Sequence, residues 1–452
     1  MARSSPITKS FREFRRGLRA RRVLVVAALA LLLTGGLVIL TMVLPGCEVT
    51  PDALPTSGAS VAAVKSEPMV RVRIRRSAAS VEVAAGSGLR IGPAASARAY
   101  NVPVRIGHDG TRFVIQPAGQ QAMLWELANL PVASGDGESL TVDGQRFPHT
   151  LTIHRASPIS AGQPAVIDVI NHVPMEKYLP GVLAKELYAQ WELEAYRAQA
   201  VAARSYAIHG LSRTRGRHFD LEAGEASQAY IGVTNNPKAL AAVQATRGIV
   251  LAFGSDVLPA YYSACSGGTG QDAAMIFPNQ PDLPPLRGFS QGDWGKECAY
   301  FRWSVIIDKP LLARRMAGWG RSVGHAIGNL QSIRDVQVAA TNSLGRPTRF
   351  VVHDQNGAQY AMGAEQFRFA CNYDGAVPTG APALPPTDAK QMLRSSHVAI
   401  TVTATDVRMN GAGFGHGVGM DQYGAQAMAK QGYQAGGILK FYYPGADLRQ
   451  AY

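Results

Sequence analysis

One carboxylate in this sequence is placed where it could act as a general acid or base. Glu186 ends the stretch "VPMEKYLPGVLAKE", four residues after Val182 and three after Leu183, so in a helix it would share their apolar side. Burial of this kind favours the protonated carboxyl group, which general acid catalysis requires. A structural interpretation, in which Glu186 forms a salt bridge to Arg197 or Arg204, is equally compatible with the residues.

A second group of polar side chains follows a glycine-rich segment near the C-terminus. In "NGAGFGHGVGMDQYGAQAMAKQG" glycines alternate around His416, and glycine lets a backbone take positive φ and approach a ligand closely. A helix beginning near Met420 would carry Gln422 and Tyr423, which can hydrogen-bond to hydroxyl and amide groups. The segment lacks the features of a dinucleotide fingerprint and of a P-loop. A structural turn and a ligand-binding loop both remain open.

Ser266, in "SACSGGTG", is a hydroxyl in another glycine-rich loop. The G-x-S-x-G elbow of serine hydrolases is missing, so turn chemistry is favoured over nucleophilic catalysis.

Apolar periodicity predicts the elements that would position these residues. Residues 67–171 alternate apolar and polar side chains between turn formers, as in "MVRVRIRR" and "AVIDVINHVP", which is typical of half-buried strands. From Val173 the period becomes helical, and we expect a break at Pro180. The next helix, "LEAYRAQAVAARSYAI", has small residues spaced so that another backbone can approach it closely. We therefore predict an α+β fold, with a β-rich part over 67–171 and a region over 172–452 that holds the helical site around a groove.

A Pro/Ala/Gly-rich insertion interrupts the second region over residues 372–390. The chain of 452 residues, 46% of them hydrophobic, is long enough for two or three domains.

The N-terminus predicts a membrane anchor. Residues 1–22 hold eight Arg and Lys side chains against Glu13, which is +7 of the net charge of +13 and leaves +6 for the rest, so the charge does not indicate nucleic-acid binding. The uncharged residues 23–44 could cross ~30 Å of hydrocarbon as a helix. The basic residues place the tail in the cytoplasm and the main domain outside, after a linker over 45–66. The alternatives are a cleaved signal peptide and lipidation at Cys47 of "LPGC".

The other cysteines fit an exported chain. No C-x-x-C pair is present, so we expect no structural zinc site built from cysteines, whereas disulfides persist outside the cytoplasm. The most economical pairing among Cys265, Cys298 and Cys371 joins Cys265 to Cys298 across a Pro/Gly-rich loop. The sequence does not fix this connectivity.

Five segments together resemble the SpoIID/LytB family, the stage II sporulation protein D type. In chain order they are "VPMEKYLPGVLAKEL", "EAYRAQAVAARSYA", "ATRGIVL", "SGGTG" and "GHGVGMDQYGAQAMAKQGYQAGGILKFYYPGADL", and the resemblance runs from about residue 67 to the C-terminus. Members of this family that are enzymes are peptidoglycan lytic transglycosylases with a membrane anchor and an external domain. The resemblance therefore implies that this chain acts on peptidoglycan glycan strands without a cofactor.

The resemblance also implies roles for individual residues. Glu186 would be the catalytic acid and base. The side chains that would orient it or bind the substrate's acetamido and lactyl groups are Arg197, Gln199, Arg204 and Ser266 on one side, and His416, Gln422 and Tyr423 on the opposite wall.

One carboxylate would suffice for this reaction. Ordinary glycosidases use two, because one of them must deliver water or attack the sugar. In a lytic transglycosylase the C6 hydroxyl of N-acetylmuramic acid attacks its own anomeric carbon, so one residue can give and then take the proton.

The segment "DLEAGEASQAYIG" departs from a zinc-binding pattern of some family members. Asp220, Gln228, Tyr230 and Gly232 match, but Glu222, Ala226 and Ser227 stand where metal ligands would be, so we predict no metal. His209, His218 and His416 lack metal-like spacing with a carboxylate.

Two other functions remain open. The LytB branch of the family suggests a wall-binding activator of an N-acetylmuramoyl-L-alanine amidase, which would use the same groove without cutting. A membrane-tethered polymer-binding protein could instead use the alternating arginines of "MVRVRIRR", although such a pattern is more typical of a solvated strand face.

Overall fold

The computed structural model describes residues 66–156, 164–214, 216–224, 227–375 and 383–452. All of them belong to one of the chain's two units, Thr50–Tyr452. The predicted basic tail, membrane span and Cys47 lie outside the described residues, as do the linker except its last residue and part of the insertion, 376–382. Within the described residues, no helix combines the length and the apolar character needed to cross a bilayer. The anchor therefore stays a prediction.

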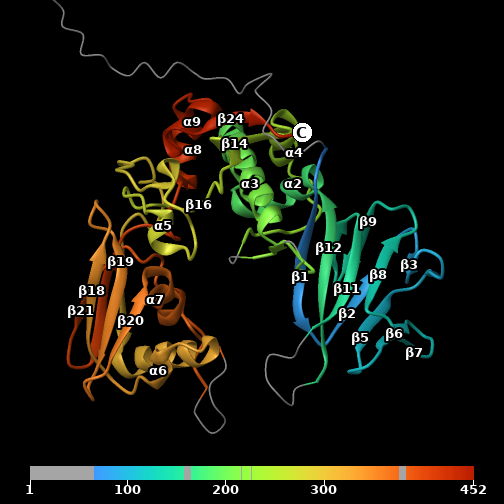
Figure 1. Ribbon diagram of the computed structural model, residues 1–452, viewed down its shortest axis with the longest axis horizontal. Coiled ribbons are helices and arrows are strands. Elements are labelled where there is room, and N and C mark those ends of the chain that lie inside the picture. Colours follow the sequence, from blue (N-terminus) through green and yellow to red (C-terminus); the bar gives the residue numbers. More distant parts are fainter. Residues whose placement is uncertain (1–65, 157–163, 215, 225–226, 376–382) are drawn as a thin grey trace, which may run out of the picture. The chain divides into compact units, whose positions relative to one another are not determined.

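All the regular elements that the structure describes before residue 175 are strands, drawn in blue to green in Figure 1. Together with β13 from later in the chain, they form a seven-stranded sheet in the order β13-β1-β12-β11-β8-β3-β4 and a six-stranded sheet in the order β10-β9-β2-β5-β6-β7. The strands are β1 (Met69–Ala78), β2 (Ser80–Ala84), β3 (Leu89–Ile91), β4 (Arg98–Tyr100), β5 (Val104–His108), β6 (Phe113–Pro117), β7 (Met123–Trp125), β8 (Asn129–Ser134), β9 (Ser139–Val142), β10 (Gln145–Pro148), β11 (Thr150–Ala156), β12 (Val166–Pro174) and β13 (Leu221–Glu222).

The alternation in the sequence explains how these sheets form their core. In β1, Val70 and Val72 are fully buried, whereas Arg71 between them and Arg73 after them keep contact with solvent. Successive side chains of a strand point to opposite faces, so this alternation gives the sheet one apolar face. The arginines are not an open basic patch, because Arg71 pairs with Asp220 and Arg73 with Asp168.

Three helices follow the sheets: α2 (Met175–Glu186), α3 (Leu193–Arg213) and α4 (Pro237–Ala245). The break predicted at Pro180 is wrong, because α2 runs through this proline and buries it among other apolar residues. The proline lacks an N–H donor and so removes one helical hydrogen bond, but tertiary packing outweighs that loss.

The small residues of α3 allow close approach, as predicted. Ser205 is fully buried, and the backbone N–H of Leu251 in β14 (Ile249–Phe253) donates to its Oγ over 2.8 Å. A larger side chain at this position would hold the strand away from the helix.

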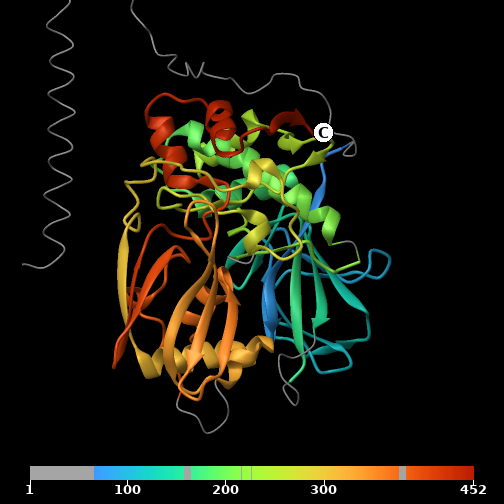
Figure 2. The same cartoon turned by 60° about the vertical axis from the view of Figure 1, so that its left-hand side comes forward.

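The rest of the chain surrounds two further cores. One lies among β17 (Trp303–Asp308), α6 (Lys309–Val323), β18 (Ile333–Thr341), β19 (Pro347–Asp354), β20 (Gln359–Gly363), α7 (Ala364–Cys371), β21 (Val398–Val402) and β22 (Asp406–Gly411). Figure 2 shows α6 across one end of the strands β18–β20. The other lies among α3, β14, α5 (Ala273–Ile276), α8 (Gln422–Lys430) and α9 (Ala435–Tyr442).

Short elements complete the order: β15 (Asp256–Val257), β16 (Tyr262–Ser263), β23 (Met420–Asp421) and β24 (Asp447–Gln450), with 3₁₀ turns at Pro284–Leu286, Ala326–Asn329 and Ala389–Gln391. The predicted α+β class is confirmed.

Candidate functional site

Glu186 is the last residue of α2, and its side chain is partly buried. Its Oε1 accepts a hydrogen bond from the backbone N–H of Ala229 over 3.0 Å, and its Oε2 accepts one from Nε2 of Gln422 over 3.2 Å. The two donors are uncharged and come from segments far apart in the chain. Together they fix the direction of the carboxylate.

The arginines proposed as salt-bridge partners of Glu186 each pair with a different glutamate. Arg197 contacts Glu194 on its own helix over 2.5 Å. Arg204 is fully buried and contacts Glu176 over 2.8 Å. The structural interpretation of Glu186 as the partner of these arginines is therefore wrong.

Behind Glu186 lies a buried network of hydroxyl and amide groups. The Tyr178 hydroxyl donates to Oε1 of Gln228 over 3.1 Å, and Nε2 of Gln228 donates to the Tyr262 hydroxyl over 3.0 Å. Burial, with a smaller contribution from the nearby charge of Glu186, holds the pKa values of Tyr178 and Tyr262 well above their ordinary value. Both phenols therefore stay protonated, and the network keeps one arrangement.

Glu186 lines a pocket of about 1030 Å³ with aromatic side chains on its walls. Tyr188, Trp191 and Tyr423 form one cluster, with ring centroids 5.0 to 6.2 Å apart, and Tyr188 is 53% exposed. Trp319 of α6 and Phe369 of α7 also line the pocket. Aromatic faces of this kind pack against the C–H faces of sugar rings, and the tyrosine hydroxyls add polar contacts.

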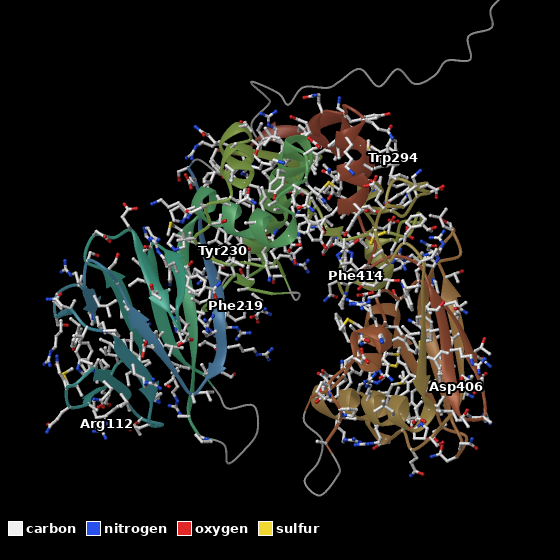
Figure 3. All side chains as sticks on the ribbon, turned by 180° about the vertical axis from the view of Figure 1, so that it is seen from behind. Arg112, Phe219, Tyr230, Trp294, Asp406 and Phe414 are labelled. Atoms are coloured by element: carbon white, nitrogen blue, oxygen red, sulfur yellow. The ribbon has the colours of Figure 1, made fainter. Side chains whose placement is uncertain are left out.

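The glycine-rich segment forms another part of the pocket wall through Phe414, Gly415 and His416. Phe414 is labelled in Figure 3. Nδ1 of His416 accepts from the N–H of Val418 over 3.0 Å. Burial lowers the pKa of His416 to about 4; the nearby Glu365 opposes this shift, and Arg368 and Arg346 add to it. The imidazole is therefore neutral at pH 7 and can accept or donate a hydrogen bond without adding charge.

Arg346 holds the two glycine-rich loops together, a role that the sequence gave no reason to expect. It is fully buried and donates to the carbonyl oxygens of Ser266 (3.0 Å), Thr269 (2.7 Å) and His416 (3.0 Å). Gly417 has φ of 75°, and a Cβ there would overlap the Arg346 guanidinium. The glycine is needed both for its backbone conformation and for the room that it leaves.

Ser266 and Asp421 connect the same loops to helix α8. Asp421 caps α8 through the N–H of Gly424 (2.8 Å), and its other oxygen accepts from the N–H (2.8 Å) and Oγ (3.0 Å) of Ser266. Burial raises the pKa of Asp421. This pair fixes the start of α8, and so the position of Gln422, its first residue.

Four of the eight predicted catalytic and substrate-binding residues line the pocket: Glu186, His416, Gln422 and Tyr423. Gln199 does not line the pocket but contacts a residue that does, because its Oε1 lies 3.4 Å from Nε2 of Gln422.

The substrate-binding roles predicted for Arg197, Arg204 and Ser266 do not fit their positions, because none of them lines the pocket. At 100° per residue, Gln199 lies about 200° around α3 from Arg197, whereas Arg204 returns to within about 20° of Arg197. The helix thus turns both arginines away from the side that carries Gln199. Ser266 is only 1% exposed.

Five groups in the pocket wall or behind it were not predicted from the sequence: the side chains of Tyr178, Tyr262, Tyr188 and Trp191, and the N–H of Ala229. Tyr178 lies eight residues before Glu186 on α2, about 80° around the helix, which is within the width of one face of an amphipathic helix. This spacing could have predicted that Tyr178 lies near Glu186. The hydrogen bond from Ala229 comes from a backbone N–H, which every residue except proline has, so the residue type could not predict it.

Cys265 and Cys298 lie next to each other, and both are buried free thiols. The hydrogen bond between their sulfurs raises the pKa of Cys265 and lowers that of Cys298. Their neighbouring positions are compatible with the predicted disulfide, which stays a prediction.

In the part of the chain that the structure describes, no group of three or more His, Cys, Asp or Glu side chains could hold a metal ion. His209 contacts the carbonyl oxygen of Val257 (3.3 Å), and His218 contacts Asp168 (3.0 Å). Three positions differ from the zinc-binding pattern of some family members. Glu222 pairs with Arg73, and Oγ of Ser227 accepts a hydrogen bond from the N–H of Glu222. Ala226 lies outside the described residues.

Residues 164–253, which contain α2, α3, α4 and β14, match the SpoIID family model, described as stage II sporulation protein. The chain is 26% identical over 287 residues to the amidase enhancer of Bacillus subtilis (strain 168), a match that covers 60% of this chain but only 40% of that relative. It is 29% identical over 282 residues to a protein of Brachyspira hyodysenteriae, covering 62% and 68% of the two chains.

A third relative is the stage II sporulation protein D of Bacillus amyloliquefaciens, 24% identical over 349 residues, which cover 71% of this chain and 90% of the relative. The family model covers the helix that ends at Glu186 and the helix that packs behind the pocket. These matches, together with the motifs that surround the pocket, support the SpoIID/LytB family for this chain.

Proposed function

We propose that this chain is a peptidoglycan lytic transglycosylase with Glu186 as its general acid and base. The observation that carries the proposal is the placement of Glu186: a partly buried carboxylate that accepts hydrogen bonds from the amides of Ala229 and Gln422, on the wall of a large pocket with aromatic sides. Such a group can exchange a proton with a sugar oxygen that lies within hydrogen-bond reach.

The reaction needs one proton donor that later becomes an acceptor. Protonated Glu186 gives its proton to the oxygen that links N-acetylmuramic acid to N-acetylglucosamine, and the bond from that oxygen to the anomeric carbon breaks. The C6 hydroxyl of the same muramic acid then forms the new bond to the anomeric carbon and returns its proton to Glu186. The products are a free 4-hydroxyl and a 1,6-anhydro end, and no water is consumed.

The other side chains of the pocket wall would bind the substrate and would not transfer protons. Tyr188, Trp191 and Tyr423 offer faces for sugar rings on the side of Glu186, and His416 offers a neutral nitrogen for a hydroxyl or acetamido group. Asp374 is a second carboxylate lining the pocket, but it is exposed and accepts from the N–H of Thr387 over 3.1 Å. It therefore makes a matched control.

The test is a product analysis with the full-length chain in mild detergent and glycan strands stripped of their stem peptides. We expect products with 1,6-anhydro ends, identified by mass because no water is added. Glu186→Gln keeps the shape and loses the proton, so product release should fall by at least about 100-fold. Asp374→Asn should leave release unchanged. Reducing ends as products, together with inactive Asp374→Asn, would replace the proposal by a two-carboxylate hydrolase.

The similarity to an amidase enhancer favours activation of a cell-wall amidase as a second candidate. In that case a partner N-acetylmuramoyl-L-alanine amidase would run faster with the wild-type chain and equally fast with Glu186→Gln, and neither would cut glycan.

We also propose that residues 23–44 anchor the chain in the cytoplasmic membrane with the main domain outside. The support is the uncharged stretch and its basic N-terminal flank. Peptidoglycan lies on that side of the membrane, so the anchor would hold the pocket next to its substrate.

A further inference from the structure

Two thiols lie beside the pocket that holds Glu186. Cys298 is one of the residues that line this pocket, and Cys265 lies directly before Ser266 in a glycine-rich loop. Both thiols are free, and their exposed fractions are 4% for Cys298 and 0% for Cys265. A chemical change at these sulfur atoms would therefore take place in the wall of the pocket.

The turn that carries Cys298 packs on the loop that carries Cys265. The carbonyl oxygen of Gly295 accepts a hydrogen bond from the N–H of Cys298 over 3.0 Å and another from Sγ of Cys265 over 3.8 Å. A side-chain hydrogen bond also joins the two thiols. Figure 3 labels Trp294, the residue before Gly295, and Phe414, whose backbone pairs with that of Cys265. The sulfur atoms thus lie where the turn meets the loop.

Asp421 connects this contact to the start of α8. A Cβ at Gly295 would come within 2.6 Å of Oδ2 of Asp421, so the turn lies directly against that carboxyl group. Ser266 donates to the same oxygen from its N–H over 2.8 Å and from its Oγ over 3.0 Å. Because Asp421 also caps α8 through the N–H of Gly424, a shift of the turn or of the loop would displace the cap.

The start of α8 in turn reaches the proposed acid. Gln422 donates to Oε2 of Glu186 over 3.2 Å. The N–H of Tyr423 donates to the carbonyl oxygen of Ala264 over 3.1 Å, and Ala264 directly precedes Cys265. A continuous set of contacts therefore runs from the two sulfur atoms to the carboxylate of Glu186.

The thiol and disulfide forms would hold this set of contacts differently. A thiol is a weak donor, and over 3.8 Å its hydrogen bond to Gly295 restrains the turn little. A disulfide would join the turn to the loop covalently and restrict their relative motion. Oxidation would also remove the thiol donor to Asp421, which keeps its hydrogen bonds from Ser266 and Gly424. The net effect of the link is a more rigid start of α8.

We propose that Cys265 and Cys298 form a redox modification site that controls the orientation of Glu186. The disulfide holds the start of α8, and with it Gln422, in place, whereas the thiol form lets this segment move. The effect on α8 stands alone, and the effect on turnover rests on the proposed function.

The oxidant is a disulfide that reacts by thiol–disulfide exchange. Two S–H bonds of the chain break and one S–S bond forms, while the two electrons and two protons pass to the oxidant, which becomes two thiols. The chain would thus reach full turnover only in a compartment where disulfides persist.

The first test needs no enzymatic activity. The full-length chain in mild detergent is prepared in the thiol form with a phosphine and in the disulfide form with glutathione disulfide. Peptide mapping by mass verifies the Cys265–Cys298 link and separates it from links to Cys47 or Cys371. Amide hydrogen exchange over residues 421–426 should be at least about threefold slower in the disulfide form. Peptides of α6 should exchange equally in both forms.

Two variants serve as controls for this comparison. Cys298→Ala cannot form the link, so its residues 421–426 should exchange as in the thiol form under both conditions. Cys371→Ala removes a thiol from another core and should respond as the wild-type chain does. Equal exchange in the two wild-type forms would overturn the proposal, as would failure of the pair to oxidise or faster exchange in every peptide of the thiol form. The wild-type comparison decides the question even if a variant misfolds.

The second test asks whether the effect acts through Gln422. We expect kcat for anhydro product to be about five- to tenfold higher in the disulfide form, with KM nearly unchanged. In Gln422→Leu the two forms should differ much less, because the hydrogen bond that transmits the effect is already lost. Equal ratios in the two chains would overturn the proposed control of Glu186. If no form yields anhydro product, the proposed function fails, whereas the exchange measurement still decides the redox site.

Discussion

Gln422 donates a hydrogen bond from Nε2 to Oε2 of Glu186 over 3.2 Å, although the two residues lie 236 positions apart in the chain. Gln422 is the first residue of α8, and its amide also lies 3.4 Å from Oε1 of Gln199. The proposed acid on α2 is thus oriented by the start of another helix, which Asp421 caps. Gln422 is a positioning residue for Glu186.

Replacing Gln422 by leucine should therefore impair turnover more than binding. Gln422→Leu keeps most of the volume and removes the donor, so the carboxylate can turn away from the glycosidic oxygen. We expect kcat for anhydro product to fall by roughly 10–100-fold and KM to change little. The exposed Gln431→Leu at the end of the same helix is the control. An increase in KM alone would make Gln422 a substrate contact instead.

Arg204→Met should destabilise the fold without changing the chemistry of the folded fraction. It leaves Glu176 without its buried partner, and breaking such a pair costs about 3–5 kcal/mol. Chemical denaturation measures the loss, and Glu176→Gln in the same chain should recover part of it. A normal free energy of unfolding combined with a raised KM would restore the substrate-binding role that the family resemblance implies.

His154 should make stability fall as the pH drops below 6.5. Its ring lies against that of His218, with centroids 4.9 Å apart and the planes tilted by 37°. Burial, His218, His172 and Arg71 outweigh Asp168 in lowering the pKa of His154 to about 4. The unfolded chain then binds the proton more tightly, so the stability from neutral His154 is complete above pH 6.5 and is lost toward pH 4.

The variant His154→Gln isolates this effect, because glutamine does not titrate. Between pH 7 and 4.5, its free energy of unfolding should fall by roughly 1–2 kcal/mol less than that of the wild-type chain, after allowance for solvent screening. Urea denaturation at several pH values measures this difference. Parallel stability curves for the two proteins would show that protonation of His154 is not coupled to folding.

Cys265 and Cys298 should form a disulfide when the chain matures in an oxidising compartment. Their sulfurs already contact each other, whereas Cys371 is fully buried in the core around α6 and α7. Peptide mapping without reductant should find the Cys265–Cys298 link and a free Cys371. A disulfide across this loop should add roughly 3–4 kcal/mol relative to the reduced protein. A link that includes Cys371 would contradict the prediction.

The predicted topology can be read by protease protection in spheroplasts. External protease should degrade residues 67–452, while an epitope within residues 1–22 stays protected. Lysed spheroplasts, in which both parts become accessible, are the control. Protection of the C-terminal part in intact spheroplasts would overturn the proposed location.

The pattern of residue types along the chain was sufficient to predict those features that depend on residues close together in the sequence. The alternation around Val70 and Val72 predicted the strands, and the small residues of α3 predicted the close approach at Ser205. The position of Glu186 beside Val182 and Leu183 marked the candidate acid. Pro180 was misjudged, because the penalty for a proline inside a helix is local, whereas the burial that offsets it is tertiary.

The sequence by itself determined the α+β class, the glycine-rich loops and the residue types that can exchange a proton or bind a sugar. Tertiary structure alone decided which of these residues meet. Gln422 reaches Glu186, while Arg204 turns toward Glu176, because the rotation of α3 and the packing of α8 set directions that residue type does not encode. The same holds for the N–H of Ala229 and for Arg346, whose roles depend on loops brought together from distant parts of the chain.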